Sequence, residues 1–213
     1  NGIKLDYKNR MDGIELLKGL PDAMTPLAFF DPEYRGLMDK MKYGNEGARQ
    51  KERALLPQMS EETIANFIKE IDRVLKPSGH LMLWVDKFHL CEGIKNWIEG
   101  TQLEIVDMIT WDKGKIGMGY RTRRRSEYLM VLQKKPKRAK GVWNSHDIPD
   151  VWVEKLNGDR HPHAKPKGLH MALIKATTKE GDIIVDPAAG GFSIMEIAIK
   201  LNRHFVGGDL NVD

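Results

Sequence analysis

The 213-residue chain contains a single cysteine, Cys91, and no long run of hydrophobic residues. One cysteine excludes a disulfide framework within the chain and any zinc site built from several thiolates. No apolar stretch reaches the roughly 18 consecutive residues that a membrane-spanning helix requires. Hydrophobic residues still make up 41% of the chain, which is typical of a folded domain and not of a disordered one. We therefore expect a globular protein of the cytoplasm with no membrane partner.

The chain also lacks a strong excess of either charge. It has 34 Lys and Arg against 30 Asp and Glu, a net charge of +4. The basic residues are concentrated between Lys113 and Lys140, and such a cluster can neutralise the phosphates of a nucleic acid. A solvated surface strip would have the same composition, so charge alone leaves both interpretations open. The cluster includes Arg121, Arg123, Arg124, Arg125, Lys134, Lys135, Lys137 and Arg138.

Hydrophobic periodicity predicts strands that alternate with helices along the chain. This alternation favours one α/β domain over residues 1–213, with a parallel sheet covered on both faces. A charged, glycine-containing stretch at 36–58 is expected to be a long loop, and residues 136–160 are irregular. The predicted strands are 3–6, 26–30, 80–85, 103–111, 127–133, 182–185 and 204–207. The predicted helices are 13–20, 61–75, 89–99, 168–178 and 193–201.

A loop that contains glycines follows the strand predicted at 182–185. It reads Asp186-Pro187-Ala188-Ala189-Gly190-Gly191-Phe192-Ser193 and leads into a helix. Glycine lets the backbone approach a ligand closely, and open parallel sheets bind nucleotide-like cofactors at such strand–loop–helix junctions. Asp209 ends the next strand, where its carboxylate could accept both hydroxyls of a ribose. Taken alone, the loop also fits an ordinary turn between a strand and a helix.

Two further motifs begin at Asp31 and at His161. Asp31-Pro32-Glu33-Tyr34 directly follows the strand predicted at 26–30, and alone it fits a simple strand end. His161-Pro162-His163-Ala164-Lys165-Pro166 precedes a predicted helix, and its prolines favour an extended backbone. His161 and His163 have the chemistry of metal ligands. No third ligand is present at suitable spacing, so we predict no metal site.

Together, and in this order, the three motifs resemble the β class of the S-adenosylmethionine-dependent DNA amino-methyltransferases. That family carries an Asp-Pro-Pro-Tyr-like catalytic motif, a His-Pro-x-x-Lys-Pro segment and an Asp-Pro-x-x-Gly cofactor loop. The β class places the catalytic motif first and the cofactor loop last, a circular permutation of the usual methyltransferase order. Residues 12–17, 73–79 and 109–113 resemble the family as well, so the resemblance covers almost the whole chain. Two positions depart from it: Glu33 replaces the second Pro of the catalytic motif, and Phe192 replaces the second Gly of the loop.

The resemblance implies a Rossmann-like methyltransferase fold, which is a mostly parallel, twisted sheet with helices on both faces and a circularly permuted order of motifs. It also implies S-adenosylmethionine as the cofactor. The residues implied to bind the cofactor are Asp12 at its adenine, Asp209 at its ribose, His161 and Lys165 beside it, and Asp186, Pro187, Ala188, Gly190 and Ser193 in and after the loop.

The catalytic motif implies direct methylation of an exocyclic amine, N6 of adenine. Asp31 and the carbonyl of Pro32 would accept hydrogen bonds from this amine, which localises its lone pair, and Asp31 would stabilise the positive charge that develops on nitrogen. Tyr34 would stack on the base, and Glu33 completes the motif. The base must leave the duplex to reach such a pocket. Methylation of cytosine C5 is disfavoured, because it needs a thiolate and Cys91 lies on a predicted helix.

Double-stranded DNA is the implied substrate, and the basic segment from Arg121 to Lys140 would grip its backbone. Residues 136–160 occupy the place of the target-recognition region, and their shortness predicts a short or relaxed recognition sequence. The loop at 36–58 is expected to become ordered when DNA binds. Two protein partners stay open, namely a second copy of the chain and a cognate restriction endonuclease.

Four alternatives to DNA adenine methylation remain. A cytosine-N4 enzyme uses the same chemistry, although that group more often begins its catalytic motif with Ser. An RNA adenine methyltransferase would act on an unpaired base. A non-catalytic nucleic-acid-binding subunit could keep the same fold. The basic segment and the order of the motifs argue against the fourth alternative, a small-molecule methyltransferase.

Overall fold

Eight strands form one sheet in the computed structural model, which describes residues 2–32, 59–117, 121–156 and 164–210. Their order is β1-β8-β7-β2-β3-β5-β4-β6, and only the two pairings of β5 are antiparallel. The mostly parallel sheet predicted from the sequence is thus confirmed. The strands are β1 (Asn9–Arg10), β2 (Thr25–Phe30), β3 (Leu75–Val85), β4 (Leu103–Asp112), β5 (Ser126–Lys134), β6 (Val151–Val153), β7 (Ile183–Asp186) and β8 (His204–Asp209).

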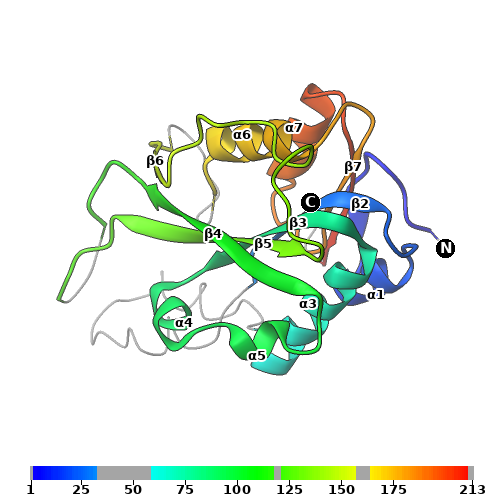
Figure 1. Cartoon of the computed structure of the whole chain (residues 1–213), viewed down its shortest axis with the longest axis horizontal. Helices are drawn as coiled ribbons and strands as arrows, with labels where there is room; N and C mark the ends of the chain where they lie inside the picture. The colour runs from blue at the N-terminus through cyan, green and yellow to red at the C-terminus, as the bar shows by residue number, and fades with distance from the viewer. Residues whose placement is uncertain (1, 33–58, 118–120, 157–163, 211–213) are drawn as a thin grey trace.

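Helices cover both faces of the sheet, as the alternating pattern predicted (Figure 1). One face carries α1, α3 and α5, whose apolar residues form a first core cluster with the sheet. The other face carries α6 and α7, which bury a second cluster. The short α4 lies near α5, on the same side as α3 (Figure 1). The helices are α1 (Gly13–Lys18), α3 (Glu61–Val74), α4 (Lys87–Glu92), α5 (Lys95–Ile98), α6 (Lys167–Thr177) and α7 (Ser193–Lys200).

The sheet brings the two ends of the chain together. Strand β2 pairs in parallel with β7, and Leu27 is aligned with Ile184. Because the carboxyl ends of parallel strands meet at one edge of a sheet, the residues that follow β2 and β7 lie at the same edge. Asp31 and Asp186, which begin two of the three motifs and lie about 150 residues apart in sequence, are therefore neighbours in space.

Helix α3 shows how the sequence produces these elements. The Ser60 hydroxyl accepts a hydrogen bond from the backbone N–H of Thr63 at 3.1 Å, which is the expected N-terminal cap. Residues at helical spacing, among them Phe67 and Ile71, are buried against the sheet. Near the end of the helix, the Arg73 guanidinium donates to the backbone carbonyls of Leu17 at 2.7 Å and Leu20 at 2.9 Å. These bonds satisfy carbonyls at the end of α1 and fix α1 beside α3.

Three predicted boundaries were wrong. Residues 3–6 form no strand, because Asp6 adopts a positive φ of 53° in a turn and its N–H donates to the Phe205 carbonyl. The single helix predicted at 89–99 is divided into α4 and α5 at Gly93, whose φ is 88°. Residues 76–79 do end α3 but belong to β3, where the pairing with β2 shifts register and Ser78 has a φ of 63°.

The described part of the irregular stretch at 136–160 lies against the body of the protein. Trp143 and Trp152 pack onto the second core cluster, and β6 extends the sheet beside β4. The Glu154 carboxylate accepts hydrogen bonds from the backbone N–H groups of Gly168 and Leu169, which caps the first turn of α6. The loop predicted at 36–58 lies outside the described residues. None of the helices in the described ranges has the length and hydropathy needed to span a membrane.

Candidate active site

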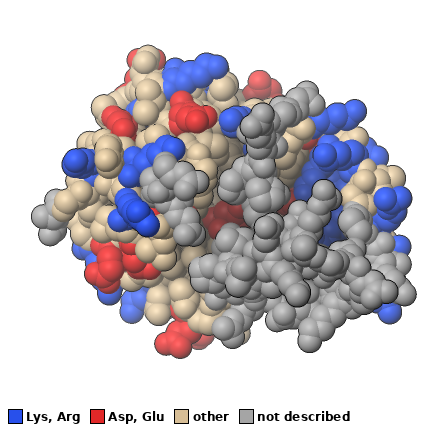
Figure 2. Space-filling model, turned by 180° about the vertical axis from the view of Figure 1, so that it is seen from behind, with Lys and Arg blue, Asp and Glu red and all other residues tan. Residues whose placement is uncertain are grey.

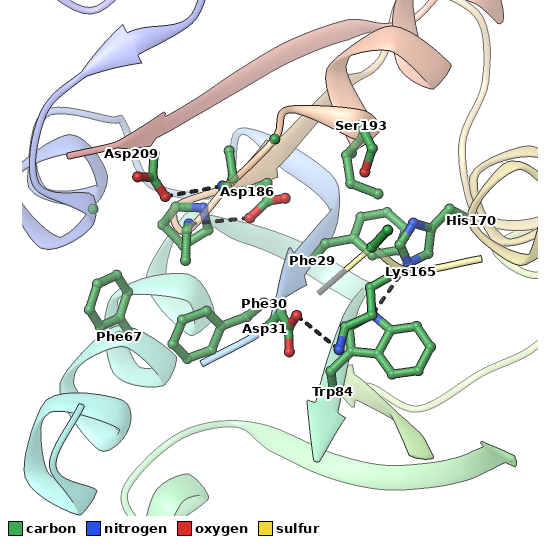
Figure 3. Close-up of a pocket in the computed structure, with 18 of the residues that line it drawn as sticks. Phe29, Phe30, Asp31, Phe67, Trp84, Lys165, His170, Asp186, Ser193 and Asp209 are labelled. Carbon is green, nitrogen blue, oxygen red and sulfur yellow. Dashed lines mark hydrogen bonds and ion pairs between the residues drawn. The ribbon is translucent and has the colours of Figure 1, made fainter. Parts of the chain in front are cut away.

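A cavity of about 310 Å³ opens at the carboxyl edge of the sheet. Its walls come from the ends of β2, β3, β7 and β8 and from the starts of α1, α6 and α7 (Figure 3). Its volume lies at the lower end of the range for small-molecule sites. Eight of the nine residues predicted to bind the cofactor line it, together with Asp31. The eight are Asp12, Lys165, Asp186, Pro187, Ala188, Gly190, Ser193 and Asp209.

Asp31 directly follows β2 and faces the cavity (Figure 3). The strand is buried along almost its whole length, and the Phe30 ring stacks on Phe67 of α3 with 4.9 Å between the ring centroids. This packing fixes the strand end from which the Asp31 side chain emerges. Pro32 is buried. Glu33 and Tyr34 of the predicted catalytic motif, and His161, lie outside the described residues.

The cofactor loop is held by short contacts to its neighbours. Its Gly190 N–H donates to the Asp209 carboxylate at 3.1 Å, and its Ala189 N–H donates to the Gly208 carbonyl at 3.1 Å. Gly13 lies so close that a Cβ there would come 2.1 Å from the Pro187 carbonyl oxygen. Glycine at position 13 is thus required for α1 to contact the loop. Asp12 caps this helix, since its carboxylate accepts the N–H groups of Ile14 and Glu15.

Asp186 is buried at the end of β7, with 7% of its surface exposed. Burial, assisted by the negative charges of Asp31 and Asp209, raises the pKa of its carboxyl to about 7. One hydrogen bond, from the Ala188 N–H at 3.2 Å, works in the opposite direction. A cation bound in the cavity would favour the ionised carboxylate.

Phe192 explains one departure from the family pattern. It has a φ of 56°, the left-handed conformation that the usual glycine adopts easily. Its ring is buried, 6.2 Å from the ring of Phe205 between centroids, as part of the second core cluster. The ring therefore points into the core and is not among the groups that line the cavity. The loop keeps its shape at a cost in backbone strain of about 1–3 kcal/mol, which burial of the ring offsets by about 1.5–3 kcal/mol.

Lys165 connects the cavity to the opposite half of the sheet. Its ammonium lies 3.1 Å from Asp31 Oδ2 and 4.9 Å from the centroid of the Trp84 ring (Figure 3). It also lies 2.8 Å from Glu127 Oε2. The two carboxylates raise its pKa above the ordinary lysine value despite burial, which acts to lower it. Lys165 is thus an ionised partner of Asp31. The sequence predicted that Lys165 lies beside the cofactor, but it did not predict this ion pair.

Sequence reasoning missed Glu127 and His170. Glu127 lies on β5 and pairs with both Lys165 and Lys113. His170 on α6 accepts a hydrogen bond from the Trp84 indole at 3.2 Å through Nε2, so its proton is on Nδ1, which has no partner among the described residues. Burial, with a smaller effect of Lys165, lowers its pKa to about 3. A histidine one helical turn after Lys165-Pro166 was the only available signal, and a buried structural histidine gives the same signal.

A family model described as a DNA methylase matches residues 27–212. The chain belongs to the DNA methylase family. The type II methyltransferase M.HhaII from Haemophilus parahaemolyticus is 61% identical over 208 residues, which are 97% of this chain and 91% of that protein. The type II methyltransferase M2.DpnII from Streptococcus pneumoniae is 30% identical over 163 residues, which cover 67% of this chain and 60% of that one.

Solved structures agree with this assignment at the level of the fold. The crystal structure of an M1.HpyAVI–SAM complex superposes with a TM-score of 0.68 at 18% identity, covering 97% of this chain and 94% of that one. The PvuII DNA methyltransferase, which is cytosine-N4-specific, gives a TM-score of 0.73 at 16% identity, covering 99% and 86%. The predicted Rossmann-like methyltransferase fold is thus confirmed. The methylase is S-adenosylmethionine-dependent, as predicted, and its substrate is DNA.

The residues of the cavity fit this cofactor. A carboxylate at the end of β8 suits a ribose, and a buried carboxylate at the end of β7 suits a positively charged group. The close contact between Gly13 and the loop forms a tight backbone cradle at the same edge. Each of these groups belongs to a strand or helix end that packing holds in place.

The predicted basic segment is divided between two edges of the methylase. Arg121, Arg123 and Arg125 precede β5, at the edge where the cavity opens, and Arg125 forms a two-bond pair with Asp112 at 2.8 and 2.9 Å. The segment 134–138 lies at the other end of β5, where it pairs with the start of β4. Lys134 donates to the carbonyls of Asp72 and Leu75 and so caps α3, while Lys135 and Lys137 pair with Glu104.

Proposed function

We propose that this methylase transfers a methyl group to N6 of adenine in double-stranded DNA. The observation that carries the proposal is the position of Asp31, a carboxylate directly after β2 at the cavity that Asp186 and Asp209 also line. An acceptor at this place can hold an exocyclic amine opposite a bound methyl donor. The family's cytosine-N4 enzymes more often have Ser at the corresponding motif position, so Asp31 favours adenine.

Asp31 and the Pro32 carbonyl supply the chemistry that the amine requires. An exocyclic amine is a poor nucleophile, because its lone pair is delocalised into the ring. Hydrogen bonds from the amine to the Asp31 carboxylate and the Pro32 carbonyl localise the lone pair, and the carboxylate stabilises the positive charge that develops on nitrogen. When bound, S-adenosylmethionine supplies an electrophilic methyl group. Tyr34 and Glu33 complete the motif, with Tyr34 stacked on the base.

The cofactor-binding roles follow the walls of the cavity. Asp209 would accept the ribose hydroxyls, Asp12 would contact the adenine, and Asp186 would face the positively charged methionine end. Pro187, Ala188, Gly190 and Ser193 would shape the loop around it, with His161 nearby. The chemistry needs these residues to bind and orient, and no residue has to form a covalent bond.

DNA would approach the edge at which the cavity opens. Figure 2 shows acidic side chains in a gap on this face, with Lys and Arg side chains on both sides. The target base must rotate out of the duplex to reach Asp31. We place the phosphate contacts on Arg121, Arg123, Arg124 and Arg125. We leave out Lys134, Lys135, Lys137 and Arg138, because they lie at the other end of β5.

The protein partners and the cellular location are proposed from similarity to a relative. The chain is 61% identical to a type II methyltransferase, which supports a cytoplasmic enzyme that protects DNA beside a restriction endonuclease. Residues 136–160 would read a short target sequence. A second copy of the chain remains a proposed partner.

Nucleoside analysis tests the proposed reaction. We expect protein incubated with labelled S-adenosylmethionine and duplex DNA to yield labelled N6-methyladenine after digestion and mass spectrometry. Asp31→Asn, which keeps the shape of the side chain, should lower the methylation rate by about 10²- to 10³-fold, because a group aimed at developing charge is lost.

Each other result has a defined meaning. N4-methylcytosine would contradict the choice of base. Label found only with single-stranded RNA would contradict the DNA substrate. Unmodified DNA from a folded protein that binds the cofactor would favour the non-catalytic subunit. Circular dichroism of wild type and Asp31→Asn controls for loss of fold.

A further inference from the structure

Four side chains of alternating charge form a row that runs from the end of β4 to the end of β2. Lys113 follows β4, Glu127 lies on β5, Lys165 precedes α6, and Asp31 follows β2. Glu127 Oε1 pairs with Lys113, and Glu127 Oε2 lies 2.8 Å from Lys165. Lys165 in turn lies 3.1 Å from Asp31. The row ends at the carboxylate to which we assign the target amine.

Within this row, Lys165 is largely shielded from water. Only 16% of the Lys165 side chain is exposed, and its ammonium faces the Trp84 ring. A buried ammonium is costly unless it is paired, and here two carboxylates pair with it. The burial that raises the pKa of Glu127 is outweighed by Lys165 and Lys113, which bring it to about 2. Glu127 is therefore ionised at every pH at which such an enzyme would be assayed.

We propose that Glu127 is a positioning residue for methyl transfer: it fixes Lys165, and Lys165 fixes the carboxylate of Asp31. This inference rests on the proposed role of Asp31. Glu127 lies on the antiparallel strand, one strand beyond β3, so it holds Lys165 from the side opposite Asp31. Without this second carboxylate, the ammonium would be drawn fully toward Asp31 and would compete with the amine for its oxygens.

Lys113 completes the arrangement on the outer side. It neutralises the second oxygen of Glu127, and its ammonium also lies 5.1 Å from the centroid of the Trp111 ring. The four charges sum to zero, so the row can be buried without a net charge. The alternative function for Lys165, direct contact with the cofactor, predicts a different effect of substitution, namely weaker cofactor binding at an unchanged rate.

Two substitutions separate charge from placement. Glu127→Gln keeps the shape and removes the charge, while Glu127→Asp keeps the charge and withdraws the carboxylate by one methylene. We expect both to lower the single-turnover rate of methyl transfer at saturating cofactor by about 10- to 100-fold, because displacement of a reacting group by about 1 Å has an effect of this size. The dissociation constant of S-adenosylmethionine, measured by calorimetry, should not change.

A pH profile gives a signature that a purely structural role would not produce. Glu127, Asp31 and, further away, Lys113 are the charged groups that face Lys165, and His170 on α6 stays neutral because its pKa is about 3. In wild type the raised pKa of Lys165 keeps it ionised, so the rate should stay level up to pH 9.5. In Glu127→Gln one counter-charge is lost and burial lowers the pKa of Lys165, so the rate should fall on the alkaline side. Glu127→Asp should show no such fall.

Glu104→Gln is the matched control. Glu104 also lies between two lysines, with Lys137 at 2.9 Å and Lys135 at 3.6 Å, but at the start of β4, away from the cavity. It should leave the rate, the pH profile and the cofactor affinity unchanged. Thermal unfolding of all three variants measures any loss of fold, and Glu127→Asp keeps the charge balance should Glu127→Gln fail to fold.

The outcomes are separable. Wild-type rates in both Glu127 variants would overturn the inference, as would weaker cofactor binding at an unchanged rate. Rates are measured on whichever base the wild-type protein methylates, so a cytosine product would change the proposed function and leave this test intact. An inactive wild-type protein would contradict the proposed function itself. In that case the same row of charges would have to be assigned to stability, and the inference would fail with it.

Discussion

Asp186 is the residue whose protonation should govern cofactor binding. Its pKa of about 7 means that much of the population is protonated near neutral pH. S-adenosylmethionine carries a net positive charge, which favours the ionised carboxylate. Binding must therefore release a proton at lower pH, and affinity should rise with pH by up to about tenfold per unit below 7 and level off above it.

Calorimetry between pH 5.5 and 8.5 measures this dependence. Buffers of different ionisation enthalpy report the released proton directly. Asp186→Asn should remove most of the pH dependence of cofactor affinity. Asp209→Asn should weaken cofactor binding but leave the pH dependence in place. A flat affinity profile in wild type would show that Asp186 does not change its protonation when the cofactor binds.

Single residues also mark the limit of what the motifs could predict. Asp31, Asp186 and Asp209 could be found because each lies at the end of a predicted strand, and parallel strands bring such residues to one edge. Glu127 could not, because it begins an antiparallel strand and its partner Lys165 comes 38 residues later. The direction of the Phe192 ring could not be predicted either. It depends on a left-handed φ, which is expected for glycine and is rare for phenylalanine.

At the scale of elements, β5 separates the basic residues at the cavity edge from those at the opposite edge of the sheet. The sequence suggested one basic segment from Arg121 to Lys140, but a strand of nine residues separates its two halves. At about 3.3 Å per residue the halves are separated by nearly 30 Å. Residues that are close in sequence therefore do not form one basic surface here, because β5 runs from one edge of the sheet to the opposite edge between them.

Paired substitutions test this division. Replacing both Arg121 and Arg123 by Ala should weaken DNA binding and reduce the slope of log affinity against log salt by about 2, since two phosphate contacts are lost. Replacing both Lys135 and Lys137 by Ala removes the same charge from the other edge and should change neither quantity. Fluorescence anisotropy with a labelled duplex at several salt concentrations measures both. Equal effects of the two pairs would show that DNA covers both edges.

Elements with strong periodicity were predicted well, and those fixed by single backbone angles were not. The buried runs of β2 and β7 and the apolar face of α3 follow directly from residue spacing. The break between α4 and α5 depends on Gly93 and on Asp86, which accepts the N–H groups of Phe88 and His89 to begin α4. A residue that caps one short helix inside a longer apolar pattern cannot be distinguished by periodicity alone.

At the scale of the whole molecule, two buried histidines tie stability to pH. His80 on β3 and His170 on α6 both lie on the face of the sheet that carries α6, and His80 contacts Trp143 with 5.6 Å between ring centroids. Burial lowers the pKa of His80 to about 4 and, with Lys165, that of His170 to about 3. Both are neutral in the folded protein at pH values where they take up a proton in the unfolded chain.

The sign of the effect follows from this difference. Above pH 6.5 neither state is protonated at these residues, so their contribution to stability is fully present. As pH falls from 6.5 toward 4, the unfolded chain binds protons that the folded protein does not, and the free energy of unfolding decreases. Each histidine accounts for up to about 1.4 kcal/mol per pH unit in this window. The raised pKa of Asp186 opposes this, because its contribution is present below pH 3.8 and is lost as pH rises through 7.

Urea unfolding between pH 7.5 and 4.5 measures the slope. His80→Phe keeps a ring beside Trp143 and removes the titration, so the loss of stability with acid should become shallower by up to about 1.4 kcal/mol per pH unit. His146→Asn changes an exposed histidine and should leave the slope as it is in wild type. The slope is the quantity to compare, because His80→Phe also alters packing by an amount that does not depend on pH. If the slope of unfolding free energy against pH is the same in His80→Phe as in wild type, His80 must reach water before the protein unfolds. Residues 136–156, which contain Trp143, would then detach from the sheet in a local opening.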